Sequence, residues 1–395
     1  MKTADLKRDF FRYQAKTTHF ASGFEVDYAK GSYIYGKDGK AYLDFVAGVS
    51  ANTLGHSFPR VINAIKEQAD RHLHVMVYGE YAQEKPVELC RKLAEVLPGD
   101  LDTTYLVNSG TEAIEASMKL AKRYTGREEI IACKDAYHGN TQGSLSLAGR
   151  EDKKRAFRPL LPMIDFIGFN SEEDLNKITK KTAAVILETI QGAAGFRVPE
   201  NDFLKKLKQR CEEAGALLIL DEIQPGFGRT GKLFAFEHYG IVPDVLVMGK
   251  GMAGGMPVGA FTSSAEKMDR LAHHPTIGHV TTFGGNPVVA AAALAVLDEL
   301  MEGPWMELIA KKEKLFRELL VHPKIKAVHG RGLMLAPELE SADYAHYIAD
   351  KCMENGLILF WLMYSEYNLR ITPPLTISED EIREGCEIIL NALND

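Results

Sequence analysis

A lysine and a carboxylate, each at the end of an apolar run, are the first residues that could do chemistry. Lys250 follows the run at 245–248 and precedes a glycine-rich stretch. An apolar setting disfavours the ammonium form, so the pKa of such a lysine falls toward the range in which the amine is a nucleophile. Asp221 ends the run at 217–220. Its burial is costly unless the carboxylate meets a cation or a hydrogen-bond donor, and a protonated pyridine nitrogen would be such a partner.

A second motif could bind a phosphate. Residues 108–112 read NSGTE, in which Ser109 and Glu112 have the spacing of a capping box at the start of a helix. The free N–H groups at such a start, the helix macrodipole and the Thr111 hydroxyl suit one phosphate group. Taken alone, the same pattern is no more than a well-capped helix.

A third motif could supply a platform for a flat ring. Tyr137, His138 and Gly139 follow the apolar stretch at 130–135. An aromatic side chain in such a loop either stacks on a ligand ring or packs in the core. A phosphate site, a ring platform, an acid for a pyridine nitrogen and an amine for an aldehyde together specify pyridoxal 5′-phosphate. The sequence therefore predicts this cofactor.

These residues need a scaffold that brings the ends of strands together. Short apolar runs alternate with helical patterns from residue 103 onward, at 103–107, 130–135, 183–188, 217–221, 244–250 and 257–263. Because these runs do not alternate in polarity, they predict an α/β fold with a mostly parallel sheet covered by helices on both faces. Ligands of such sheets bind at the carboxyl ends of the strands, where Asp221 and Lys250 stand.

The flanking regions contain shorter elements. Residues 33–45 predict a hairpin, Ser57 and Pro59 open a helix, and Ser378 and Glu381 form a capping box for the last helix. We therefore predict a small α+β domain beside a large α/β domain. The predicted division is 1–50 as an N-terminal segment joining the small domain, 51–304 as the large cofactor-binding domain, and 305–395 as the C-terminal small domain.

Composition narrows the class of protein. The 395 residues are enough for two domains, and the net charge of −7 gives no reason to expect nucleic acid or an anionic membrane as a partner. The charged N-terminus lacks the apolar core of a signal peptide, and the longest apolar run, at 357–364, is too short to span a membrane. Five scattered cysteines without a C-x-x-C pair predict reduced thiols and a cytoplasmic protein.

The order of the motifs resembles the class III aminotransferases of the ornithine and acetylornithine type, which have fold type I among pyridoxal enzymes. The resemblance runs from YLDFVAGVSANTLGH to LRITPPLTISEDEI, with NSGTEA, YHG, ETIQG, LLILDEIQPGFGRTG, MGKGMAGGMPVGA and TTFGGNP in the family's order. It implies a homodimeric transaminase that moves an amino group from an amino acid or an ω-amine to a keto acid by a ping-pong mechanism.

The resemblance also implies roles for single residues. Lys250 would form the Schiff base with the cofactor, and Asp221 would pair with the pyridine nitrogen. The further cofactor contacts that it implies are Ile223 beneath the ring, Gln224 at the phenolic oxygen, Tyr137 with His138 on the other face, Ser109, Gly110 and Thr111 at the phosphate, Glu188 beside Asp221, and Thr282 at the phosphate of the neighbouring subunit.

The chain departs from the family at two positions that concern the substrate. In the family, the position of Arg370 binds a carboxylate by a bidentate fork. Asn140 stands where the family usually has an arginine for a second carboxylate, and Ala193 stands where it has a glutamate that gates Arg370. We therefore expect an amino-acid or ω-amine donor, a class that includes ornithine-like donors, with 2-oxoglutarate or pyruvate as acceptor, and we discount acetylornithine.

Three alternatives remain open at this point. A pyridoxal lyase or aminomutase would use the same cofactor site. A nucleotide-binding protein would use the glycine-rich stretch Gly226–Lys232, although Leu233 replaces the Ser or Thr that a Walker A loop needs for Mg²⁺. A metal site would use the histidine pairs at 72 and 74 and at 273 and 274, but no Cys, Asp or Glu with ligand spacing accompanies them.

Overall fold

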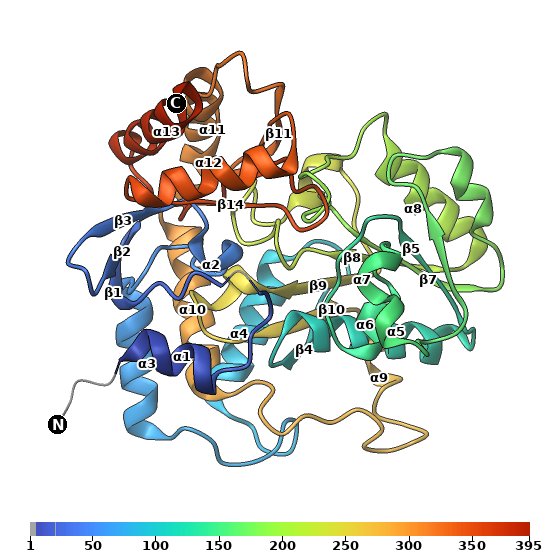
Figure 1. Ribbon diagram of the computed structural model, residues 1–395. Helices are drawn as coiled ribbons and strands as arrows, with labels where there is room; N and C mark the ends of the chain where they lie inside the picture. The colour runs from blue at the N-terminus through green and yellow to red at the C-terminus, as the bar shows by residue number, and fades with distance from the viewer. Residues whose placement is uncertain (1–4, 20) are drawn as a thin grey trace.

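A seven-stranded sheet forms the centre of the protein. The computed structural model describes residues 5–19 and 21–395 (Figure 1). The strand order is β4 (Thr103–Val107), β10 (Gly259–Ser263), β9 (Val245–Gly249), β8 (Leu217–Asp221), β7 (Thr182–Glu188), β5 (Glu129–Cys133) and β6 (Ile164–Ile167). β10 is antiparallel to both of its neighbours, and all the other pairs are parallel. The prediction of a mostly parallel sheet is confirmed.

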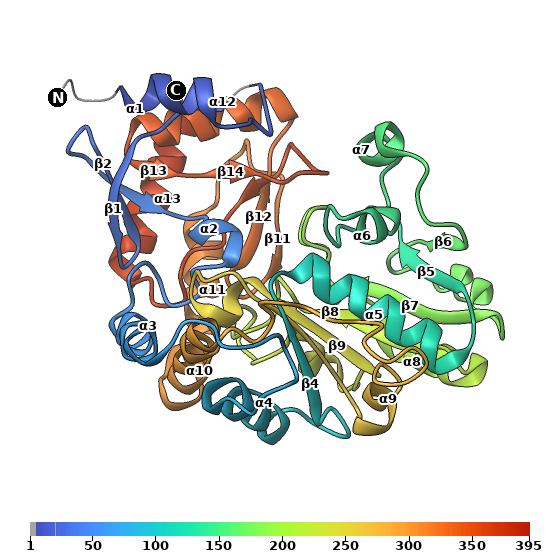
Figure 2. The same ribbon diagram turned by 90° about the horizontal axis from the view of Figure 1, so that it is seen from below.

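The central strands of this sheet are buried on both faces. Along β8, Ile219 packs into one apolar cluster, whereas Leu218 and Leu220 pack into the cluster on the opposite face. The helices on the two faces are α5 (Gly110–Thr125) on one, and α4 (Glu84–Val96), α8 (Phe203–Ala214) and α10 (Pro287–Glu302) on the other (Figure 2). Burying each Leu or Ile contributes about 1.5–3 kcal/mol, which is why β8, and β7 after its first residue, are apolar up to the carboxylates that end them.

A smaller sheet joins the two ends of the chain. It has the order β1 (Val26–Lys30), β2 (Tyr33–Gly36), β3 (Ala41–Asp44) and β13 (Leu357–Ile358). β2 and β3 form the predicted hairpin. Its turn needs Gly39, whose φ is +80°, and the Asp38 carboxylate accepts a hydrogen bond from the Tyr42 hydroxyl at 2.6 Å. β13 adds to β3 in parallel, so residues more than 300 positions apart in the sequence lie side by side.

The C-terminal segment covers the smaller sheet. Its helices α11 (Trp305–Leu319), α12 (Ala342–Glu354) and α13 (Glu379–Asn394) lie together at the top of Figure 1. The strands between them are β11 (Ala327–Arg331) and β12 (Met334–Glu338), which pair with each other, and β14 (Phe360–Trp361) and β15 (Leu369–Arg370), which form a second pair. Ser378 and Glu381 form the predicted capping box at the start of α13.

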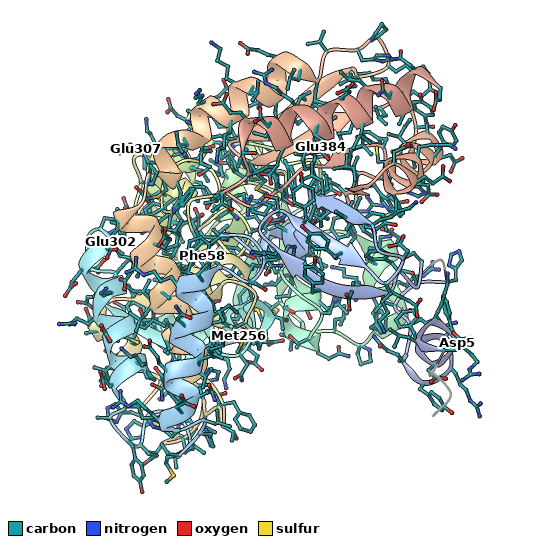
Figure 3. The ribbon with its side chains drawn as sticks, turned by 90° about the vertical axis from the view of Figure 1, so that its left-hand side faces the viewer. Asp5, Phe58, Met256, Glu302, Glu307 and Glu384 are labelled. Atoms are coloured by element: carbon teal, nitrogen blue, oxygen red, sulfur yellow. The ribbon has the colours of Figure 1, made fainter. Side chains whose placement is uncertain are left out.

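The helix predicted after Ser57 is present, but its start differs. α3 (Pro59–Arg71) has Phe58 at the N-cap, at the labelled end in Figure 3, and the Ser57 hydroxyl instead donates to the carbonyl of Ala29 at 3.0 Å. The remaining elements are α1 (Leu6–Tyr13), α2 (Ala47–Ser50), α6 (Gln142–Ser146), α7 (Glu151–Lys154), α9 (Ala265–Asp269) and the 3-10 turns η1 (Arg155–Phe157), η2 (Glu173–Lys177), η3 (Ala235–Tyr239) and η4 (Lys250–Ala253).

None of the helices in residues 5–19 and 21–395 is long and apolar enough to cross a bilayer. The division into domains at residues 50 and 304 stays a prediction, and its first segment includes residues 1–4 and 20, which lie outside the described part.

Candidate active site

The carboxyl ends of three adjacent strands bring the predicted chemical residues together. Glu188 and Asp221 are the last residues of β7 and β8 and lie opposite each other in the strand register. Lys250 comes directly after β9, the next strand of the sheet. Because parallel strands end at one edge of a sheet, an acid, a second acid and an amine meet there.

A cavity of about 450 Å³ opens at this edge. Eleven of the predicted site residues line it: Gly110, Thr111, Tyr137, His138, Asn140, Glu188, Asp221, Ile223, Gln224, Lys250 and Arg370. Ser109 and Thr282 are not part of the lining. Ser109 lies behind it as the N-cap of α5, and Thr282 is exposed on the segment before α10.

Asp221 is held by two hydrogen bonds inside the protein. One carboxylate oxygen accepts from the N–H of Ile223 at 2.9 Å, and the other lies 2.7 Å from Nδ1 of His138. Burial disfavours a charged His138 ring, but the hydrogen bond to Asp221 and its charge outweigh that effect, so the pKa of His138 is raised. The buried carboxylate is therefore fixed in orientation and has a proton donor beside it.

Lys250 combines a strained backbone with an altered amine. Its φ is +41°, a left-handed conformation that a non-glycine residue rarely adopts and that is found mainly where function requires it. Burial lowers the pKa of Lys250, and the charge of Asp221 offsets only part of that effect. The lowered pKa increases the neutral fraction of the amine, which is the form that acts as a nucleophile.

Glu188 ties the Tyr137 loop to the end of β7. Its carboxylate accepts from the N–H of Gly192 at 2.8 Å and from the N–H of Tyr137 at 3.2 Å. Burial raises the pKa of Glu188 to about 7. These two hydrogen bonds hold the loop that carries Tyr137 against the end of β7.

One wall of the cavity is formed by Ile223, which packs against the start of α5. A Cβ atom added to Gly110 would lie 2.7 Å from Cδ1 of Ile223, so glycine is required for this close approach. The first N–H groups of α5 have no acceptors within the helix and can bind an anion. An apolar side chain and an anion-binding helix start thus lie next to each other.

The predicted capping box at the start of α5 is not reciprocal. The Ser109 hydroxyl accepts from the N–H of Glu112 at 3.4 Å, as predicted. The carboxylate of Glu112, however, accepts from the N–H of Asn108 at 2.7 Å and from its side-chain amide at 3.0 Å. Glu112 therefore accepts hydrogen bonds from Asn108 and not from the N–H of the N-cap residue Ser109. The second hydrogen bond of the predicted capping box was wrong.

Arg370 enters the cavity from the C-terminal segment at the end of β15. It is 9% exposed, and its Nε has no hydrogen-bond partner among residues 5–19 and 21–395. Burial lowers its pKa to about 10, which leaves the guanidinium charged at neutral pH. A buried cation without a carboxylate partner is costly, and an anionic ligand is its natural partner.

These residues fit pyridoxal phosphate by their chemistry. Lys250 is an amine with a lowered pKa for the aldehyde, and Asp221 is an oriented acid for the ring nitrogen. Tyr137 and Ile223 offer flat or apolar surfaces for the ring, and the start of α5 offers N–H groups for the phosphate. The arrangement can therefore bind the predicted cofactor.

Sequence reasoning missed three side chains of the lining, Val49, Pro225 and Met363, of which Pro225 directly follows the predicted Gln224. Val49 lies in α2, where Ala47, Gly48 and Ser50 also have positive φ values. Met363 lies between β14 and β15. Val49 and Met363 come from segments that lie far from the central sheet in the sequence. The only signal for either residue was that Val49 lies inside the first motif of the resemblance.

The two unrelated alternatives find no support in the structure. Lys232 is exposed and does not line the cavity, and Arg229 of the same glycine-rich stretch is buried and donates to the carbonyl of Leu333 at 3.3 Å. That stretch therefore packs against the C-terminal segment. In the described part of the chain, no three His, Cys, Asp or Glu side chains are grouped so as to hold a metal ion.

Comparison with known proteins agrees with the geometry. The family model described as aminotransferase class-III matches residues 13–393. An acetylornithine aminotransferase from Caldanaerobacter subterraneus subsp. tengcongensis is 38% identical over 378 residues, which is 93% of each chain. A [LysW]-aminoadipate semialdehyde transaminase from Deinococcus radiodurans is 37% identical over 92% of this chain and 85% of the relative.

A solved structure confirms the predicted fold class. The ornithine aminotransferase from Toxoplasma gondii ME49 superposes with a TM-score of 0.91 at 31% identity, covering 100% of this chain and 96% of that chain. A transaminase from the marine bacterium Virgibacillus has a TM-score of 0.92 at 23% identity over 98% of both chains, which shows a shared fold.

Proposed function

The chain belongs to the class III aminotransferases, and from that premise we propose that the cavity at the ends of β7, β8 and β9 binds pyridoxal 5′-phosphate and transfers an amino group between an amino donor and a keto acid. One observation carries the proposal: Lys250, Asp221 and Arg370 line the same cavity. The family match favours amino transfer over the lyase, aminomutase and nucleotide-binding alternatives.

Lys250 is the proton carrier of the proposed reaction. When bound, pyridoxal phosphate supplies an aldehyde carbon for the amino group and a ring that takes up electron density. Nζ of Lys250 removes the proton from the amine-bearing carbon of the donor and holds it for return. Burial, which lowers the pKa of Lys250, increases the neutral fraction that can do this near neutral pH.

Asp221 and His138 act on the ring nitrogen of the cofactor. A buried carboxylate stabilises a proton on that nitrogen, and the hydrogen bond from His138 holds the carboxylate in place. Raising the nitrogen's pKa by about two units requires about 3 kcal/mol, which a desolvated carboxylate can supply.

Arg370 defines the substrate class. Its guanidinium is buried and charged, and Ala193, which lines the same cavity, offers no carboxylate to neutralise it. An α-carboxylate can therefore bind Arg370 as a bidentate pair without displacing a protein group. Amino-acid donors, with pyruvate or 2-oxoglutarate as acceptor, follow from this, and an ω-amine that carries a carboxylate at its other end also fits.

A second copy of the chain belongs to the proposed active site. Thr282 lies on an exposed segment together with Ile277, Val280 and Phe283, which are 70%, 52% and 58% exposed. Apolar side chains gathered on one surface segment are typical of an interface. In the proposed homodimer, Thr282 reaches the phosphate of the neighbouring subunit.

Two measurements test the proposal. Protein saturated with pyridoxal phosphate is mixed with a panel of amino donors, and conversion of pyruvate to alanine and of 2-oxoglutarate to glutamate is followed. Borohydride treatment should fix the cofactor on Lys250, as seen by peptide mass, and the Lys250→Ala variant should show neither attachment nor transfer. Ammonia release or amine migration without consumption of a keto acid would support the lyase or aminomutase instead.

A further inference from the structure

Three hydroxyl groups and one carboxylate form a cluster directly behind the start of α5. Oγ1 of Thr111 lies 2.6 Å from Oγ of Ser144 and 2.9 Å from Oγ1 of Thr141. The hydroxyls of Thr141 and Ser144 are 3.0 Å apart. Thr111 lines the cavity, whereas the side chain of Ser144 is fully buried. The cluster thus links a cavity residue to a hydroxyl that no ligand can reach.

Glu115 fixes the direction of one hydrogen bond in the cluster. Its Oε1 accepts from the Thr141 hydroxyl at 2.5 Å and from the N–H groups of Gly143 and Ser144 at 2.8 and 3.0 Å. A carboxylate can only accept, so the hydroxyl proton of Thr141 is directed to Glu115 and is not available to the other two hydroxyls.

The remaining protons can then be assigned. The N–H of Thr141 donates to Oγ1 of Thr111 at 3.4 Å. Ser144 can donate to Oγ1 of Thr111 at 2.6 Å or to the carbonyl of Thr141 at 3.2 Å, and the shorter distance favours Thr111. With both lone pairs of Thr111 occupied by these donors, its own proton can go to Oγ1 of Thr141 at 2.9 Å or to an acceptor on the cavity side, which a bound phosphate would supply.

The backbone nearby leaves room for this arrangement. Gly139 has φ of +134°, and a side chain there would collide with the Thr111 hydroxyl. Glycine is therefore required both by the backbone conformation and by the space that the cluster occupies. The loop that carries Tyr137 and His138 is shaped around the Thr111 hydroxyl.

We propose that Ser144, held in place by Glu115, is a positioning residue that turns the hydroxyl proton of Thr111 toward the cofactor phosphate. The inference rests on the proposed binding of pyridoxal phosphate. A hydroxyl that donates to a phosphate oxygen makes a charge-assisted hydrogen bond, stronger than one between neutral groups. Without Ser144, one lone pair of Thr111 loses its donor, and the Thr111 hydroxyl is free to rotate away from the cavity.

The test compares two ligands that differ only in the phosphate. Cofactor-free protein is titrated with pyridoxal 5′-phosphate and with pyridoxal, and binding is followed by absorbance. Ser144→Ala should weaken binding of the phosphorylated ligand by about five- to tenfold, the effect of losing one hydrogen bond, and leave pyridoxal binding unchanged. Cysteine at position 144 keeps about the same side-chain volume but is a weaker hydrogen-bond donor. If Ser144→Ala does not fold, Ser144→Cys should show the same selective loss of binding of the phosphorylated ligand.

Ser146→Ala is the matched control. Ser146 is a buried hydroxyl of the same short helix, and it donates to the carbonyl of Gln142 rather than to Thr111. This variant should leave the ratio of the two affinities as in the wild type. A Ser144 variant that weakens both ligands equally, or neither, would show that Ser144 has a structural role only.

A double-mutant cycle with Thr111→Val gives a second test. If Ser144 acts through the Thr111 hydroxyl, the Thr111→Val/Ser144→Ala protein should bind the phosphorylated ligand as Thr111→Val does alone. Additive losses would overturn the inference. Failure of the wild type to bind pyridoxal phosphate would instead overturn the proposed function, so the two failures are distinguishable.

Discussion

Nδ1 of His138 lies 2.7 Å from a carboxylate oxygen of Asp221, and both side chains are buried. The two residues come from different elements, since His138 follows β5 and Asp221 ends β8. The second carboxylate oxygen is held by the N–H of Ile223. The acid that the proposed reaction needs is therefore oriented by protein groups before any ligand binds.

Asp221→Asn should reduce the turnover number by a factor of about 100 while the protein still binds cofactor. An amide cannot stabilise a proton on the ring nitrogen, and the loss of about 3 kcal/mol in that stabilisation corresponds to two powers of ten in rate. Steady-state kinetics with saturating cofactor measure the effect. Asp202→Asn, at a side chain that is 67% exposed, is the control and should match the wild type. An unchanged turnover number in the Asp221 variant would rule out this role.

The stability that His138 contributes should depend on pH. The pKa of His138 is raised in the folded protein because the hydrogen bond and charge of Asp221 outweigh burial. The contribution is therefore complete below the ordinary histidine pKa of about 6.5 and is lost as pH rises through the raised value. The gap in melting temperature between wild type and His138→Asn should shrink from pH 6 to pH 9. A gap that stays constant from pH 6 to pH 9 would show that the ion pair between His138 and Asp221 does not contribute in this way.

The strand-end residues were predictable because their signal is local. The apolar runs before Asp221 and Lys250 predict buried strands, and parallel strands end at one edge of a sheet, so the pattern places both residues together. The roles of Gln224 and Arg370 came from the resemblance alone, because neither composition nor spacing marks these two residues as part of a site.

The parts that were not predicted depend on contacts between distant segments. Val49 reaches the cavity because α2, which carries it, contacts η4, the turn that begins at Lys250 about 200 residues later. The carboxylate of Glu112 accepts a hydrogen bond from the side-chain amide of Asn108 and not from the N–H of the N-cap residue Ser109, because the two donors compete for it. The buried hydroxyl of Ser144 shows no sequence signal, since its partner Thr111 is 33 residues away.

Ala193→Glu should make the enzyme discriminate against α-carboxylates. Ala193 lines the cavity with Arg370, and a carboxylate there would pair with a guanidinium whose Nε has no partner in the described part of the chain. The substrate would then have to displace that carboxylate, so KM for α-amino acids should rise about tenfold or more, with a smaller effect on simple amines. Ala193→Gln adds the same bulk without charge and should raise KM for both donor types equally. Equal effects of the two variants would mean that charge plays no part.

Asn140→Arg should broaden the range of carboxylate substrates, whereas Ala193→Glu should narrow it. Asn140 lines the same cavity as Arg370 and Tyr137, so an arginine there would place a second cation where the substrate's far end can reach it. A donor with a second carboxylate gains a charge-assisted pair, which contributes about 1.5–3 kcal/mol, so kcat/KM for dicarboxylate donors should rise about tenfold or more. A monocarboxylate donor such as alanine should gain nothing, because in the proposed binding mode its only carboxylate pairs with Arg370. Asn140→Met has similar length without charge and should leave dicarboxylate donors no better than in the wild type. If the arginine variant leaves the ratio between the two donor classes unchanged, Asn140 does not face the part of the cavity that selects the donor.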